Sequence, residues 1–351
     1  MNKPSRGNLF ALLAIIIPMI PIAGVGFIIG AAMVIMDIDE ESFSMVTYMS
    51  FEVIYALAII LLIYIYLDAT KKRFKDVFRF KMLSFKNYLF VILITVCLWF
   101  IVDIIAIFTA FFFHDPVEGM LESFKDLPLI LMILSLGVKP AIFEELVMRG
   151  IVLSEYKDVP IAKAALVNGF IFGAFHLNFQ QFFYAFTLGI VLAYLAYYTE
   201  SILAPILSHF VFNMTSVLYV YFSDFPESEA AMFSYDKWIA ALIPALIYSA
   251  VFLPILILLL RSFIKYNRNR LALCDEAIDA QDTGADGALA PLLEENAEAD
   301  GALAPLSEDA LPMPAPAVKQ KVFTVSFWLI VIVFVVFSVL VEVSTRYFLI
   351  E

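Results

Sequence analysis

Cysteine, histidine and positive charge are scarce in this 351-residue chain, and each scarcity excludes a class of protein. Two cysteines are too few for a disulfide framework and are not spaced as metal ligands. The 22 basic residues are outnumbered by 34 acidic ones and form short clusters, so the sequence predicts no nucleic-acid partner. The chain also has no G-x-S-x-G elbow for a serine nucleophile and no H-E-x-x-H helix for zinc.

Apolar residues, in contrast, are abundant. They make up 63% of the chain, with a mean hydropathy of +0.92, whereas about half is usual for soluble domains. Lipid can solvate such a surface and water cannot, so we expect an all-α, polytopic transmembrane helix bundle. Eight spans would form the core and a ninth would be appended at the C-terminal end. The predicted spans lie at about 9–36, 46–67, 88–113, 127–153, 161–177, 179–198, 202–222, 238–260 and 322–343.

The charges between these spans predict the orientation and the domains. Seven basic residues between 71 and 86 indicate a cytoplasmic loop, which places the N-terminus in the cytoplasm of a multi-pass protein suited to a bacterial plasma membrane. Residues 1–270 would form the helix bundle. Residues 271–318 contain eleven acids, no Lys or Arg, and a repeated ADGALAPL segment, so a disordered cytoplasmic linker is predicted there. Residues 319–351 would carry the appended helix.

Two adjacent carboxylates and an arginine lie in the fourth predicted span. Ionisable groups within a membrane cost several kcal/mol unless they are paired or hydrated, so they are functional candidates. Glu145 and Arg149 are four residues apart and should pair on one helix face. Glu144 is rotated by about 100° from Glu145 and could face a cavity. The alternative is that these charges lie at the level of the lipid headgroups.

Polar residues recur in two of the next three spans. His176 lies deep in the fifth span, one turn after Phe172, and His209 and Asn213 lie one turn apart on the seventh. A lone histidine is more often a packing residue, and a His/Asn pair often forms hydrogen bonds between membrane helices. All three clusters fall within seventy residues, however, so neighbouring helices would direct a carboxylate, an imidazole and an imidazole–carboxamide pair into one bundle.

These side chains suit peptide hydrolysis. A glutamate with a histidine can hold and deprotonate a water molecule. A histidine with an asparagine can donate hydrogen bonds to the oxyanion that forms on the scissile carbonyl. The set therefore supplies one group for each task of the reaction.

The order of the motifs resembles the CPBP family, the CAAX proteases and bacteriocin-processing enzymes also called Abi. The motifs are Glu-Glu-x-x-x-Arg, Phe-x-x-x-His and His-x-x-x-Asn, at Glu144/Glu145/Arg149, Phe172/His176 and His209/Asn213. The resemblance covers about 127–222. It implies a glutamate-type intramembrane endopeptidase that needs no metal or cofactor and cleaves a membrane-bound, in some members prenylated, protein or peptide.

The resemblance also implies a role for each motif residue. Glu144 and His176 would activate the water, and His209 and Asn213 would form the oxyanion hole. Glu145, Arg149 and Phe172 would shape the site. A metal ion held by the two histidines and two carboxylates is a less favoured alternative.

Other interpretations remain open at this stage. A non-catalytic membrane scaffold or bacteriocin-immunity-type protein could keep the same fold, and a transporter could use the same buried charges to relay ions. Charged residues elsewhere in spans include Glu52 and Lys139, and we expect Lys139 to be an interfacial charge. His176 would lie deeper than Glu144 unless the fifth span begins after Lys163 or is unusually short.

Overall fold

A computed structural model describes residues 2–36, 40–114, 127–222, 235–282 and 320–348, and within these residues the ordered elements are all helices. The predicted all-α helix bundle is confirmed. The α-helices are α1 (Lys3–Met36), α2 (Glu40–Thr70), α3 (Phe74–Phe78), α4 (Phe85–Ala110), α6 (Leu129–Met132), α7 (Lys139–Glu145), α8 (Ile161–Phe175), α9 (Phe179–Thr199), α10 (Leu203–Phe222), α11 (Tyr235–Asp282) and α13 (Val325–Phe348). Two π-helices, η1 (Ile133–Val138) and η2 (Leu146–Val152), and the 3₁₀ helix η3 (Leu153–Tyr156) complete the order.

Among the described residues, six helices are long and apolar enough to cross a bilayer, which agrees with a polytopic membrane protein. They are Lys3–Met36, Thr47–Thr70, Phe85–Ala110, Phe179–Thr199, Tyr235–Ala272 and Val325–Thr345. Two further apolar helices, Ile161–Phe175 and Leu203–Tyr219, are shorter. The fourth expected span, at 127–153, is a helical run that changes type several times between α6 and η3.

The central helical run is irregular where the first motif lies. Two π-helical segments flank the single α-helical stretch α7, which carries Glu144 and Glu145. Pro140, near the start of α7, has no backbone N–H and cannot continue the α-helical hydrogen-bond pattern. Short π-helical segments of this kind are frequent at functional sites.

Glycines allow α8 and α9 to pack with their backbones in close contact. A Cβ atom on Gly189 would lie 2.8 Å from the Cα of Gly169, and one on Gly169 would lie 2.9 Å from the carbonyl oxygen of Phe186. A Cβ on Gly173 would lie 2.8 Å from the carbonyl oxygen of Phe182. Small residues at helix interfaces have this role in membranes because no larger side chain fits.

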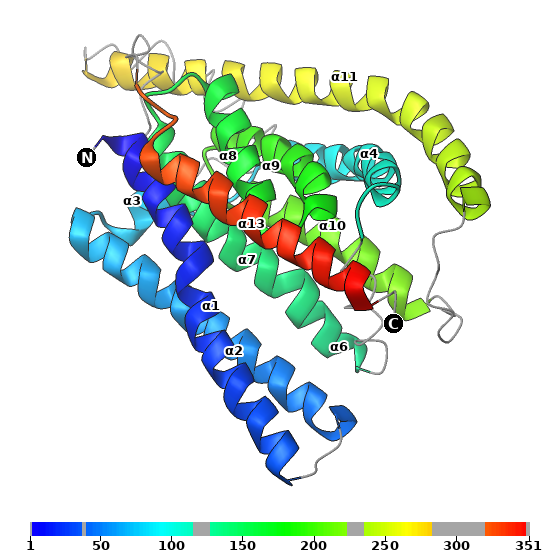
Figure 1. Ribbon diagram of the computed structural model, residues 1–351. Helices are drawn as coiled ribbons and strands as arrows, with labels where there is room; N and C mark the ends of the chain where they lie inside the picture. The colour runs from blue at the N-terminus through cyan, green and yellow to red at the C-terminus, as the bar shows by residue number, and fades with distance from the viewer. Residues whose placement is uncertain (1, 37–39, 115–126, 223–234, 283–319, 349–351) are drawn as a thin grey trace.

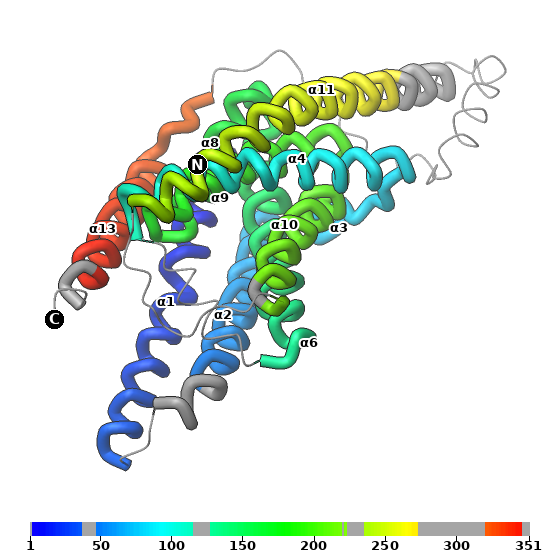
Figure 2. The backbone as a smooth tube through the Cα atoms, turned by 90° about the vertical axis from the view of Figure 1, so that its right-hand side faces the viewer, coloured from blue at the N-terminus to red at the C-terminus, as the bar shows by residue number. Residues whose placement is uncertain are grey.

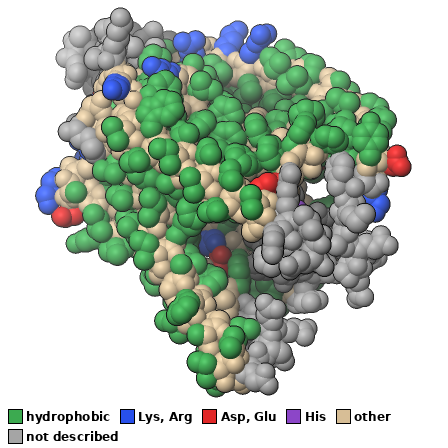
Figure 3. All heavy atoms as spheres, in the orientation of Figure 1, with side chains coloured by type: hydrophobic (Ala, Val, Ile, Leu, Met, Phe, Trp, Pro, Cys, Tyr) green, Lys and Arg blue, Asp and Glu red, His purple; other side chains and the backbone are tan. Residues whose placement is uncertain are grey.

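The other helices are arranged around α8 and α9. In Figures 1 and 2, α11 runs along α4, and the hairpin of α1 and α2 projects away from α8 and α9. The first half of α11 curves in Figure 1, and Pro244 and Pro254 lie in that half. The face in Figure 3 is mostly apolar, as lipid contact requires, but a basic and an acidic side chain lie together in a recess at its middle.

The C-terminal helix α13 packs against the bundle. In Figure 1 it crosses α8 and α9, and its buried residues include Phe327 and Phe334. Asn8 of α1 donates hydrogen bonds to the carbonyl oxygen of Val322 and the hydroxyl of Thr324, both at 2.9 Å. The span expected as an appendage is therefore bound to α1, α8 and α9.

The expected linker lies largely outside the described residues. Helix α11 continues to Asp282, so the segment from 271 to 282 is helical, and residues 283–318 are not described.

Candidate functional site

The buried ion pair of Glu145 and Arg149 forms the centre of the candidate site. Arg149 Nη1 donates to Glu145 Oε1 at 2.7 Å, and both side chains are excluded from solvent. Arg149 Nη2 donates to the carbonyl oxygen of Gly189 at 2.9 Å, so the guanidinium also links η2 to α9. Its Cζ atom lies 4.6 Å from the ring centroid of Phe172, a favourable cation–π distance. The predicted pairing of Glu145 with Arg149 is confirmed.

His209 of α10 is held by the same carboxylate. Its Nδ1 lies 2.9 Å from Glu145 Oε1, and the imidazole is buried. An ionised carboxylate can only accept, so Nδ1 carries a proton, and Nε2 becomes a donor whenever the ring is cationic. Glu145 therefore fixes the orientation of His209.

His176 lies where α8 ends. It caps the helix, and the next residue, Leu177, has a left-handed backbone conformation with φ of 53°. In the turn between α8 and α9, the side chain of Asn178 accepts a hydrogen bond from the backbone N–H of Gln181, at the start of α9. His176 Nδ1 lies 2.9 Å from the carbonyl oxygen of Phe172. That oxygen can only accept, so a neutral His176 has its lone pair on Nε2.

Helix α8 is shorter than a typical transmembrane span. Helix α8 begins at Ile161, so it does not start after Lys163, and its 15 residues rise by about 22 Å. A span usually needs about 30 Å of helix. His176 is thus at the end of a short helix, and its depth in the bilayer stays a prediction.

Phe172 lies between the two histidines. Its ring contacts His176 at a centroid distance of 5.1 Å and His209 at 5.7 Å, both edge to face at 89°. Together with its contact to Arg149, this makes Phe172 the side chain that the three motifs share.

Glu144 is half-buried and is separate from the ion pair. Its Oε2 atom is buried and has no hydrogen-bond partner within the described part of the chain. The carboxylate lies close enough to Arg149 and to Tyr55 of α2 for its charge to act on both. Glu144 thus differs from Glu145, whose Oε1 atom is bound by both Arg149 and His209.

Asn213 contacts a backbone carbonyl rather than another motif side chain. Its Nδ2 donates to the carbonyl oxygen of Leu136 in η1 at 3.0 Å. Pro140, four residues after Leu136, lacks the N–H that would bond to this oxygen in an α-helix. The contact fixes Asn213 and leaves its second amide hydrogen for another acceptor.

Lys139 and Glu52, which the sequence analysis named without a role, lie beside the site together with Tyr55, which it did not name. Lys139 of α7 forms an ion pair with Glu52 of α2, and its Nζ lies 5.3 Å from the ring centroid of Tyr55. Lys139 is therefore paired between helices and is not an isolated interfacial charge. Tyr55 could have been found from the sequence, because it lies three residues after Glu52 and so shares its helix face.

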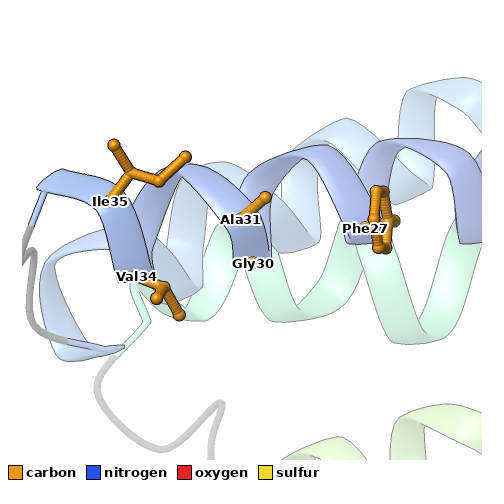
Figure 4. A pocket seen from close by; sticks show the side chains of 5 residues that line it. All are labelled: Phe27, Gly30, Ala31, Val34 and Ile35. Atoms are coloured by element: carbon orange, nitrogen blue, oxygen red, sulfur yellow. The ribbon is translucent and has the colours of Figure 1, made fainter.

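Two hollows in the structure are apolar. A groove of about 260 Å³ lies between α7 and α10 and is lined by Val138, Ala141, Ile142, Ile206 and Phe210. The hollow in Figure 4 lies near the C-terminal end of α1, where Phe27, Gly30, Ala31, Val34 and Ile35 line it. Neither includes a candidate catalytic residue. Among the described residues, no group of three or more His, Cys, Asp or Glu side chains is placed to hold a metal ion.

Comparison with known proteins identifies a family for this part of the chain. Residues 126–215 match a family model described as "Type II CAAX prenyl endopeptidase Rce1-like". The resemblance to the CPBP family is thereby confirmed. The match supports a CAAX-type intramembrane protease, a multi-pass membrane location and a membrane-associated substrate. No curated protein and no solved structure matched the chain.

Proposed function

We propose that this chain, whose residues 126–215 match the Rce1-like CAAX prenyl endopeptidases, is an intramembrane endopeptidase that hydrolyses a peptide bond in a membrane-associated or prenylated substrate. The observation that carries the proposal is the contact of all three motifs around Phe172. Its ring touches Arg149, His176 and His209, and a packing role for each motif alone would not require this convergence.

Glu144 and His176 activate the water in this proposal. Glu144 is half-buried and lies outside the ion pair of Glu145 and Arg149, and His176 presents Nε2 because its Nδ1 is held by the carbonyl oxygen of Phe172. The water loses a proton to Glu144, and its oxygen forms a bond to the scissile carbonyl carbon. When the intermediate collapses, the C–N bond breaks and the proton passes to the leaving amine.

His209 and Asn213 stabilise the oxyanion. The hydrogen bond from Nδ1 to Glu145 orients the ring, and when His209 is protonated its Nε2–H donates to the developing negative charge. Asn213 donates its second amide hydrogen. Removing one such donor typically lowers kcat by about 10²–10³-fold.

Glu145 and Arg149 shape the site. Two carboxylates with Arg149 alone would leave one net negative charge in the site, and a cationic His209 balances it. Arg149 also ties η2 to α9 through Gly189. This pair therefore positions the oxyanion donor without touching the substrate.

We further propose that the protein lies in a bacterial plasma membrane with its N-terminus in the cytoplasm. The support is the distribution of basic residues, seven of which lie between 71 and 86. The active site would then open toward the cytoplasmic half of the bilayer.

Proteolysis by the purified protein in liposomes tests the proposed function. Prenylated and unprenylated peptides would be compared, with Glu144→Ala, His176→Ala and a chelator beside the wild type. His114→Ala is the matched control because His114 is exposed and lies outside the site. We expect both site variants to lose at least about 10²-fold in rate, and the control and chelator to have no effect.

Other outcomes favour the competing functions. Activity that a chelator abolishes and zinc restores would make these residues metal ligands. If wild-type protein cleaves nothing and Glu144→Ala still supports the cellular phenotype of the protein, the non-catalytic scaffold is the better interpretation.

A further inference from the structure

Two polar side chains of α2 lie beside the candidate site, and the proposed reaction does not use them. Glu52 and Tyr55 are three residues apart on α2 and share one helix face. Lys139 of α7 contacts both, through an ion pair with Glu52 and a cation–π contact with Tyr55 at 5.3 Å. A polar connection thus runs from α2 to the helix that carries Glu144.

The ion pair is sheltered from solvent. The Lys139 side chain is 23% exposed and that of Glu52 is 18% exposed. Glu52 also shares a hydrogen bond with the hydroxyl of Tyr48, one turn earlier on α2. A partly buried ion pair is stable only when its charges are well paired and hydrogen-bonded. These contacts therefore fix how α2 and α7 are oriented toward each other.

Tyr55 and Glu144 have complementary unpaired atoms. Tyr55 Oη and Glu144 Oε2 are both buried, and neither has a hydrogen-bond partner among the described residues. Lys139, whose Nζ lies 5.3 Å from the Tyr55 ring centroid, and Glu144 are five residues apart on α7, so Tyr55 lies beside the helix that carries Glu144. The electrostatic interaction of Glu144 with the Tyr55 hydroxyl agrees with this placement. A hydroxyl can donate and a carboxylate can only accept. Buried polar atoms are seldom left unpaired, and functional sites are one place where they occur.

We propose that Tyr55 is a positioning residue of the site, whose hydroxyl donates a hydrogen bond to Glu144 Oε2, while Glu52 and Lys139 hold the tyrosine ring in place. The inference rests on the proposed function, in which Glu144 is the general base. Hydrogen bonds of this kind often tighten only when substrate binds. A carboxylate fixed through one oxygen presents the other to the water, so the base starts each reaction in one orientation.

The variant Tyr55→Phe removes the hydroxyl and keeps the ring. The matched control is Tyr64→Phe on the same helix, where the side chain is 67% exposed. We expect Tyr55→Phe to lower kcat by about 10–100-fold, with KM and the midpoint of thermal unfolding unchanged. Tyr64→Phe should leave all three quantities unchanged. A wild-type kcat in Tyr55→Phe would overturn the inference.

Infrared spectroscopy of the full-length protein provides a readout that does not need activity. The carboxylate band of Glu144 is identified as the band lost in Glu144→Gln. It should shift in Tyr55→Phe and stay in place in Tyr64→Phe. An unshifted band in Tyr55→Phe overturns the inference, even if kcat falls. If the wild type cleaves no peptide and Glu144→Ala still supports the cellular phenotype, the proposed function fails, and the band alone decides whether Tyr55 bonds to Glu144.

Discussion

Arg149 satisfies acceptors on two different elements. Its Nη1 donates to Glu145 and its Nη2 donates to the carbonyl oxygen of Gly189, within a fully buried site. Because His209 uses the same oxygen of Glu145, the arginine indirectly sets the position of that imidazole. Arg149 thus supports both the packing of η2 on α9 and the geometry of the candidate site.

Replacing Arg149 with Met should destabilise the protein more than replacing both partners. Arg149→Met leaves a buried carboxylate without its cation, which typically costs about 3–5 kcal/mol. The double variant Glu145→Gln/Arg149→Met removes that charge and should recover part of the loss. Thermal unfolding in detergent measures both. If the single variant is as stable as the wild type, the ion pair does not support the fold.

At this scale, the sequence predicted contacts within a helix better than contacts between helices. The spacing of Glu145 and Arg149 was enough to predict their pairing, because four residues return to one helix face. The contact of Asn213 with Leu136 depends on an N–H that Pro140 lacks. The proximity of Tyr55 to Glu144 depends on how α2 is rotated against α7, which helical periodicity does not define.

The glycine contact between α8 and α9 leaves no room for a side chain. Gly189→Ala would place a Cβ atom 2.8 Å from the Cα of Gly169, where no side chain can move away. We expect about 1–3 kcal/mol of destabilisation, together with lower activity because the Gly189 carbonyl binds Arg149. Gly24→Ala, with nothing within 4 Å, is the control. Equal melting temperatures of both variants would contradict the expectation.

Helix α13 should contribute to stability through its aromatic contacts. Phe334 packs on Phe179 and Phe182, with ring centroids 5.4 and 4.8 Å apart. Phe334→Ala should cost about 1–3 kcal/mol, below the value for a soluble core because lipid replaces part of the lost contact. Val336→Ala, at an exposed position, should have little effect on thermal unfolding. If the two variants melt alike, α13 is an appendage after all.

The sequence predicted the long helices but not how they pack or where they are irregular. Hydropathy identified the long apolar helices, because about twenty apolar residues are a strong signal. It gave no sign that α13 is packed into the bundle, since lipid-facing and helix-facing surfaces are equally apolar. The π-helical segments around α7 were also missed, although Pro140 marked the position of the irregularity.

One end of the bundle is held together by charged residues from distant segments. The buried carboxylate of Glu155 binds Arg6 at 2.9 Å and Lys72 at 2.6 Å. Lys3 binds Asp158 at 2.6 Å, and this hydrogen bond holds the pKa of the Asp158 carboxyl below its usual value. The N-terminus, the basic loop after α2 and the end of η3 therefore meet on the same side.

Different contacts define the other end. Trp238 at the start of α11 donates to the carbonyl oxygen of Ile107 near the end of α4 at 2.8 Å. The backbone N–H of His114 donates to Glu342 of α13 at 3.2 Å. Helix α4 connects the two ends, and its 26 residues rise by about 39 Å, enough to cross a bilayer.

Single cysteines at the two ends test the orientation of the whole molecule. In a background without Cys97 and Cys274, Lys71→Cys marks the basic end and Lys237→Cys the opposite one; both positions are exposed. The positive-inside rule places Lys71 in the cytoplasm. A membrane-impermeant maleimide should therefore label Lys237→Cys on intact cells and Lys71→Cys only after lysis. Labelling of Lys71→Cys on intact cells would invert the topology, and the site would then serve substrates from the outer face.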